Sequence, residues 1–177
     1  MLNVLIDAGA DLNKIHDSEE KEDEMQSISY TPLMFAVMYK NIENARILIN
    51  NRNVNVNNKA DGGDTALHLV AFTNNEDRMS KVINWLIKKG ANIDEQNDEL
   101  QTPLHDAIYN HNLTIAFKLI NAGADVNIKN NKDTTALMMA ARKNTEMNEN
   151  IVKFLIKKGA DVNNKNIKNE TALHYAI

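Results

Sequence analysis

The chain has 177 residues, of which 43% are hydrophobic and 25% are charged, a composition typical of a folded globular protein and not of a disordered one. It contains no cysteine, which excludes disulfides, thiolate zinc sites and cysteine nucleophiles. The net charge of -4 offers phosphate backbones no general attraction, and no apolar run approaches the roughly 18 residues of a membrane span. We therefore expect an intracellular, cytoplasmic protein that binds neither nucleic acid nor membrane.

The N-terminal segment Met1–Ala8 has the pattern of a short helix, and an acidic segment follows it. Asp17–Glu24 contains six acids and one lysine. Such a run of like charges is predicted to be a solvated insertion in a surface loop. Its deletion is expected to leave the fold intact.

The rest of the chain alternates between two recurring phrases. The first combines threonine, proline or alanine, leucine, and histidine or methionine, and it starts at Thr31, Thr65, Thr102, Thr135 and Thr171. Threonine is a good helix N-cap and proline a good first helical residue, so each phrase predicts the start of a short helix. A second apolar pattern at helical spacing follows each phrase, as in Ile151, Val152, Leu155 and Ile156.

The second phrase ends these second helices. It reads Gly-Ala-Asp-Val-Asn at Gly123 and Gly159, with close variants beginning at Gly9, Asn53 and Gly90. The glycines are predicted to end each helix in a left-handed conformation. The steps between successive threonines are 34, 37, 33 and 36 residues, so the chain is a tandem repeat with insertions.

This paired alternation resembles the ankyrin repeat, and the resemblance covers the whole chain. It implies an all-α solenoid of stacked helix-turn-helix units with short β-hairpin fingers, and one continuous array with no separate domains. The array divides into a partial repeat (1–13), a repeat with the acidic insertion (14–57), three further repeats (58–94, 95–127, 128–163) and a final partial repeat (164–177). The incomplete ends suggest a fragment of a longer array, although a natural C-terminal half-repeat is the alternative.

The sequence departs from the family pattern at two glycine positions. Nine residues after each threonine, where the family has glycine, stand Lys40, Asn74, His111 and Asn144. Two residues before each threonine the family again has glycine, and only Gly63 matches. Asn and Asp tolerate a positive φ, so Asp133 and Asn169 are suitable replacements, whereas Leu100 is not. The turn of that finger is therefore left open.

The histidines could suggest a metal site, but their positions favour a structural role. His68, His105 and His174 all stand fourth in the threonine phrase, where Met34 and Met138 occupy the other repeats. A shared metal site would not tolerate methionine there. No nucleophile–base pair and no phosphate-binding glycine loop is visible. We therefore expect no catalytic residue, no metal, no cofactor and no small-molecule substrate.

The resemblance also implies where a partner would bind. Ankyrin proteins usually contact partners through a concave groove, which is lined by the residues seven and eight positions after each threonine and by the residue before it. The seventh positions are Met38, Phe72, Tyr109 and Arg142; the eighth are Tyr39, Thr73, Asn110 and Lys143; the preceding ones are Tyr30, Asp64, Gln101 and Thr134. Aromatic residues, Met and Arg are enriched at interface cores. The alternative, in which the fingers cover these side chains and make them part of the core, remains open here.

The sequence thus predicts a non-catalytic module that binds a protein partner through the groove and fingers. The alternative function is a targeting or substrate-recruiting arm of a larger enzyme or channel. Nucleic-acid binding would require a basic groove, and Arg142 and Lys143 make only a small basic patch.

Overall fold

The computed structural model describes residues 1–15, 29–73, 79–142 and 146–177. The acidic segment Asp17–Glu24 and residues Asn74, Lys143 and Asn144 lie outside these ranges, so the expectations for them stay predictions. None of the helices in these ranges combines the length and the hydrophobicity that a membrane span requires.

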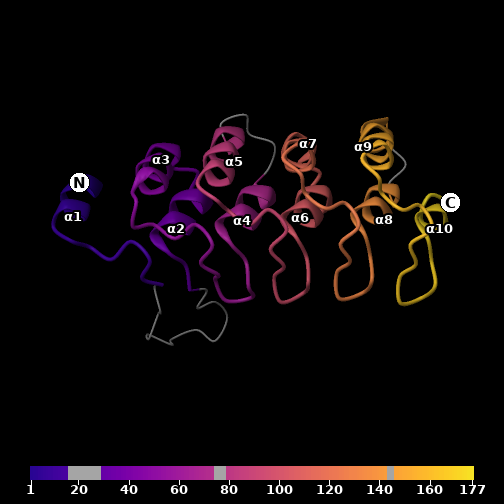
Figure 1. Ribbon diagram of the computed structural model, residues 1–177, viewed down its shortest axis with the longest axis horizontal. Helices are drawn as coiled ribbons and strands as arrows, with labels where there is room; N and C mark the ends of the chain where they lie inside the picture. The colour runs from indigo at the N-terminus through magenta and orange to yellow at the C-terminus, as the bar shows by residue number, and fades with distance from the viewer. Residues whose placement is uncertain (16–28, 74–78, 143–145) are drawn as a thin grey trace.

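The described helices form two parallel layers that run the length of the molecule (Figure 1). The inner layer contains α2 (Pro32–Met38), α4 (Ala66–Phe72), α6 (Pro103–Tyr109), α8 (Ala136–Ala141) and α10 (Ala172–Tyr175). The outer layer contains α1 (Leu2–Asp7), α3 (Ile42–Asn50), α5 (Met79–Lys88), α7 (Leu113–Asn121) and α9 (Glu146–Lys157). Each inner helix contacts the next inner helix, and α3, α5, α7 and α9 contact one another in the same order. The expected all-α solenoid of stacked helix pairs is confirmed.

The inner helices begin where the threonine phrase predicts. Each of the five threonines is the N-cap of its helix, with extended backbone. The Thr31 hydroxyl accepts a hydrogen bond from the Met34 amide (3.3 Å), which satisfies one of the free N–H groups of the first turn. In the histidine-containing phrases the imidazole takes part as well, because the Thr65 amide donates to Nδ1 of His68 (3.1 Å).

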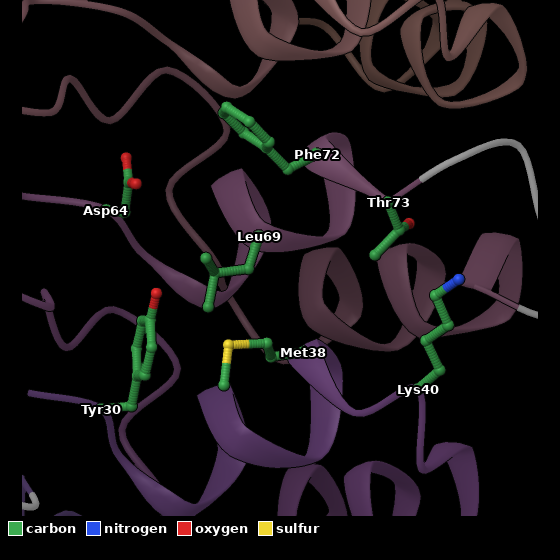
Figure 2. A pocket seen from close by; sticks show the side chains of 7 residues that line it. All are labelled: Tyr30, Met38, Lys40, Asp64, Leu69, Phe72 and Thr73. Carbon is green, nitrogen blue, oxygen red and sulfur yellow. The ribbon is translucent and has the colours of Figure 1, made fainter. Parts of the chain in front are cut away.

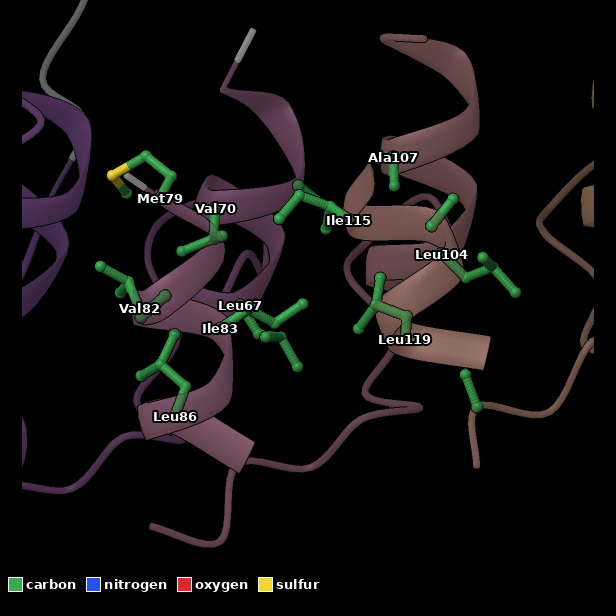
Figure 3. Packing of buried hydrophobic residues seen from close by; sticks show 14 of the residues in the cluster. Leu67, Val70, Met79, Val82, Ile83, Leu86, Leu104, Ala107, Ile115 and Leu119 are labelled. Carbon is green, nitrogen blue, oxygen red and sulfur yellow. The ribbon is translucent and has the colours of Figure 1, made fainter. Parts of the chain in front are cut away.

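Apolar side chains between the two layers form one continuous core (Figure 3). Leu67 of α4 and Leu104 of α6 occupy equivalent positions, and each is only 1% exposed. They pack with apolar residues of the outer helices, such as Ile83 of α5 and Leu119 of α7. Each helix pair therefore depends on its neighbours for burial, as expected of a solenoid.

The fingers are the loops that project from the inner helices on the side away from the outer layer (Figure 1). A backbone hydrogen bond closes each of four of them, from Ala60 to Asp64, from Asn97 to Gln101, from Asn130 to Thr134 and from Asn166 to Glu170. Neighbouring fingers are also linked, since the Asp98 amide donates to the Gly62 carbonyl (2.9 Å). In the described ranges these hairpins contain no β-strand, only the isolated bridge between Lys129 and Thr135. Their arms are too short to build a ladder, and part of their hydrogen bonding is directed to adjacent fingers.

The finger turns settle the question left open at Leu100. Leu100 adopts φ 56°, in the same left-handed region as Gly63 (φ 80°) and Asp133 (φ 53°). Its amide donates to the Asn97 carbonyl (2.8 Å), so the turn is retained despite a strain of about 1–2 kcal/mol for a leucine. Gly63 has a second requirement, because a Cβ there would lie 2.8 Å from the backbone nitrogen of Asp98.

A row of side-chain amides ties each unit to the next. The Asn57 side chain accepts from the Asn92 amide (2.8 Å) and donates to the Gly90 carbonyl (3.1 Å). Asn127 makes the same two bonds two units later, with the Asp161 amide and the Gly159 carbonyl. Asp94 stands in the same column and accepts from the Asp125 amide (3.0 Å), but an ionised carboxylate has no N–H to donate.

Candidate functional site

The seventh positions of the repeats lie at the C-terminal ends of the inner helices, on the side of the fingers. Their side chains are largely exposed: Met38 is 38% exposed, Phe72 50% and Tyr109 64%. Arg142, which is the C-cap of α8, is exposed as well. The fingers therefore do not bury these residues in the core. Their binding to a partner stays a prediction.

Two pockets lie between the inner helices and the fingers. The first, which we call the Leu69 pocket, has a volume of about 410 Å³. It is lined by Tyr30, Met38, Lys40, Asp64, Leu69, Phe72 and Thr73. Figure 2 shows Tyr30 and Asp64 on the loop side, facing Met38, Leu69 and Phe72 on α2 and α4. Burial, and after it the charge of Asp64, raises the pKa of the Tyr30 hydroxyl, so this group stays a neutral donor.

The second pocket, which we call the Asp106 pocket, has a volume of about 380 Å³. Phe72 and Tyr109 line it from α4 and α6, so Phe72 belongs to both pockets. Gln101 and Thr134 line it from the fingers, and Arg142 from the end of α8. The expected groove residues before α6 and α8 are thus brought together with the aromatic residues. Further lining residues are Glu99, Asn130, Asn131, Lys132, Met139 and Tyr175.

Asp106 of α6 is the functional candidate that sequence reasoning missed. It lines the second pocket and is only 2% exposed. It stands four residues after Thr102, and the same position in the other units holds an apolar or aromatic residue: Phe35, Leu69, Met139 and Tyr175. One acid in an apolar column is the signal that a column-by-column comparison of the repeats would have found.

The surroundings of Asp106 favour its neutral form. Burial, and after it the negative charges of Asp64 and Glu99, raises the pKa of Asp106 to about 8. Its Oδ2 atom is buried, as is Oε1 of Gln101, and neither atom has a hydrogen-bond partner among the described residues. Buried polar atoms are nearly always paired, so two unpaired oxygens in the lining of one pocket are a notable cost to the fold.

A possible metal site adjoins this pocket, but one of its members fits a metal badly. Asp64, His68 and Asp106 place one potential ligand atom each within 4.8 Å of the others. Nδ1 of His68 accepts from the Thr65 amide, which leaves the ring proton on Nε2, 3.1 Å from the Gln101 carbonyl oxygen. A protonated Nε2 that donates to a carbonyl is not a metal ligand.

The three histidines of the threonine phrases, His68, His105 and His174, form hydrogen bonds within the fold. His68 and His105 each join an inner helix to the next finger, through Nε2 to the carbonyl of Gln101 and of Thr134 (3.2 Å) respectively. Burial lowers the pKa of both, that of His105 to about 4, so both rings are neutral near pH 7. His174 makes the local contact that His68 and His105 also make, between its Nδ1 and the hydroxyl of its own threonine, Thr171 (2.9 Å).

Three of the expected groove residues lie outside the two pockets or outside the described ranges. Tyr39 is 74% exposed and stacks on Phe35, and it lines a separate hollow beside Leu2 of α1. Asn110 is the C-cap of α6, and its side chain donates to the Asp106 carbonyl (2.9 Å). Lys143 is not described. The eighth positions therefore contribute one residue to the pockets, Thr73.

Comparison with known proteins agrees with this architecture. The sequence profile of a family described as ankyrin repeats (3 copies) matches residues 1–97, 33–130 and 104–177. The chain is 36% identical over 104 residues to an ankyrin repeat protein of fowlpox virus (strain NVSL), a match that covers 58% of this chain and 29% of that protein.

Two other relatives belong to different kinds of protein. A Dictyostelium discoideum protein described as a serine/threonine-protein kinase is 28% identical over 161 residues, which covers 71% of this chain and 19% of the kinase. Alpha-latrocrustotoxin of Latrodectus tredecimguttatus is 34% identical over 143 residues, which covers 81% of this chain and 9% of the toxin. The chain thus spans less than a third of the length of each of these relatives.

Proposed function

The chain belongs to the ankyrin-repeat family, and from this premise we propose that it is a non-catalytic module that binds a protein partner along the groove formed by the Leu69 and Asp106 pockets. Ankyrin repeats generally mediate contacts between proteins. The proposal extends this general role to particular residues, with Tyr30, Met38, Phe72, Tyr109 and Arg142 as the contacts.

One observation supports the proposal above the others: the aromatic and methionine side chains at the ends of α2, α4 and α6 are exposed in a row. Folded proteins expose few contiguous apolar patches unless these contact something. Phe72 lines both pockets, which makes it the central member of the row. Central aromatic residues of this kind contribute most of the binding energy at interfaces.

The groove also suggests what the partner presents. The Leu69 pocket would hold an apolar side chain against Met38, Leu69 and Phe72. Arg142, exposed in the lining of the Asp106 pocket, would pair with an acidic residue of the partner. We therefore propose that the partner presents a segment with an apolar residue at one end and an acidic residue at the other. We also propose that this contact takes place in the cytoplasm.

The test compares the unaltered chain with a Phe72→Ala/Tyr109→Ala double variant. A partner is first isolated by affinity capture from an extract of the cells that make the protein, and its binding is then titrated. We expect the double variant to lose about 2 kcal/mol or more of binding free energy, roughly thirtyfold in affinity. Its stability should barely change, because both side chains are half exposed or more.

Tyr39→Ala is the matched control, since Tyr39 is an exposed aromatic residue outside both pockets. If a partner binds the double variant as tightly as the unaltered chain, the proposal that it binds in the groove is wrong. Loss of binding in Tyr39→Ala alone would move the contact to the hollow beside α1.

A second function is suggested by the relatives. The kinase from Dictyostelium discoideum and the Latrodectus toxin carry similar sequence in a small part of a much longer protein. The array would then be a targeting or substrate-recruiting arm of a larger enzyme or channel. The groove would keep the same role, and the sequence that flanks the array in the gene decides between the two.

A further inference from the structure

Two buried side-chain oxygens belong to residues that line the Asp106 pocket. Oδ2 of Asp106 and Oε1 of Gln101 are buried, and both lack a partner within the described part of the chain. The Gln101 side chain is held in place from its other end, because its Nε2 donates to Glu99 (2.8 Å). The free oxygens are therefore positioned and not mobile surface groups.

Negative charges act on Asp106. Asp64 and Asp106 place carboxylate oxygens within 4.8 Å of each other, and the charge of Glu99 also acts on Asp106. Lys132 on the next finger and Arg142 at the end of α8 also line the pocket, and both are exposed. A positive group beside Asp106 would be attracted by the charges of Asp64 and Glu99 and would favour the ionised form of Asp106.

We propose that the Asp106 pocket is a binding site for one cationic side chain, lysine or arginine, whose N–H groups donate to Oδ2 of Asp106 and Oε1 of Gln101. This inference rests on the proposed function, since the side chain would come from the partner bound in the groove. It adds a basic residue between the apolar and acidic ends of that partner segment.

The walls of the pocket suit such a side chain along its whole length. Phe72, Tyr109 and Met139 provide apolar and aromatic surface for the aliphatic stem of a lysine or arginine. The two aromatic faces would also attract the cationic head. A neutral donor could satisfy the two oxygens, but it would leave the charges of Asp64 and Glu99 unbalanced.

Binding would also change the proton on Asp106. The raised pKa of about 8 means that Asp106 is mostly protonated at pH 7 in the free protein. A nearby cation favours the carboxylate, so binding would release this proton. His68 would stay neutral, because burial lowers its pKa and its ring bonds are already made.

The test uses a small cation in place of the partner. The full chain, labelled with ¹³C and ¹⁵N, is titrated with n-butylguanidinium chloride while the Asp106 carboxyl and Gln101 side-chain amide signals are followed by NMR. We expect both signals to change with one saturable curve in the millimolar range. At saturation the pKa of Asp106 should fall by about one pH unit, a tenfold change in proton affinity.

Two variants complete this test. Above about pH 9, where Asp106 is ionised with and without the cation, Asp106→Asn, read through the Gln101 amide, should bind the cation about tenfold more weakly. Asp94→Asn removes an acid outside both pockets and should bind as the unaltered chain does. Changes no larger than those from sodium chloride at equal ionic strength would overturn the proposal, as would equal binding of n-butanol. Saturable binding of Zn²⁺ at these same signals, without binding of butylguanidinium, would show a metal site instead.

The outcomes separate this inference from the proposed function. If the double variant Phe72→Ala/Tyr109→Ala loses its partner but the unaltered chain does not bind butylguanidinium, the proposed function is supported and the cation site is rejected. If butylguanidinium binds but the partner binds the double variant as tightly as the unaltered chain, the cation site is supported and the groove as partner-binding surface is rejected.

Discussion

The Leu69 pocket and the Asp106 pocket are built on two neighbouring helices of the same design. Leu69 and Asp106 stand four residues after the N-cap threonines of α4 and α6, and Leu67 and Leu104 anchor the two helices equally deeply. The first pocket presents an aliphatic side chain at this position and the second a buried acid. The comparison teaches that a repeat keeps its framework while one position changes what the groove can recognise.

The largest expected effect tests whether the framework is shared. Leu67→Ala and Leu104→Ala should each destabilise the protein by about 2–5 kcal/mol, because each removes a fully buried side chain and leaves a cavity. Urea denaturation would give the two values. Since neighbouring units share interfaces, hydrogen exchange should show the loss of protection spreading to adjacent units. A loss confined to the altered unit would contradict the solenoid coupling.

The next effect comes from giving the Asp106 pocket the same kind of residue as the Leu69 pocket. Asp106→Leu should stabilise the protein by about 1–3 kcal/mol at pH 7, because it removes a buried acid with an unpaired oxygen. The reciprocal change Leu69→Asp should cost a similar amount. If Asp106→Leu instead destabilises the protein, the buried acid contributes to stability, and the expected cost of burying it is wrong.

The pH dependence of stability identifies the cause of that gain. Since the pKa of Asp106 is raised from 3.8 to about 8, the folded state holds a proton that the unfolded state has already lost. Stability therefore falls as the pH rises, by up to about 1.4 kcal/mol per pH unit. His68 and His105 act in the opposite direction, but only below about pH 6.5, where the unfolded state becomes protonated. The unaltered chain should lose stability between pH 6.5 and 8, and Asp106→Leu should not.

The smallest effect concerns Asp94, a second acid at a repeat position where other units have a different residue. It tests whether such an acid lowers the stability of the protein outside the pocket as well. Asp94 replaces the asparagine of the inter-unit amide row, and burial is the main cause that raises its pKa. Asp94→Asn would add a hydrogen bond of the kind that Asn57 and Asn127 make, and it should stabilise the protein by about 0.5–1.5 kcal/mol. Thermal melting would measure this gain, and groove binding should be unchanged. A loss of stability would show that the amide cannot reach the Gly123 carbonyl.

Local sequence patterns predicted most of the fold. The five N-cap threonines, the helix-ending glycines at Gly90, Gly123 and Gly159, and the structural histidines all stand where the sequence indicated. These features depend on a few neighbouring residues, so a repeated phrase carries them completely. One exception was the turn at Leu100, where hydrogen bonds of the finger hold a leucine in a conformation that its own preference disfavours.

The groove was predicted less completely, because it depends on which side chains from different units meet. The sequence indicated a row at the ends of the inner helices, but it could not show that Tyr39 faces a separate hollow or that Asn110 caps its own helix. Nor could it show that Asp64, Gln101 and Asp106, from two fingers and a helix, come together around one buried carboxyl. By itself the sequence determined the repeat, its helices and their order, because these arise from local capping and apolar spacing. Only the tertiary structure decided the pockets and the pKa of Asp106, because burial and the distance between charges are set by stacking one unit on the next.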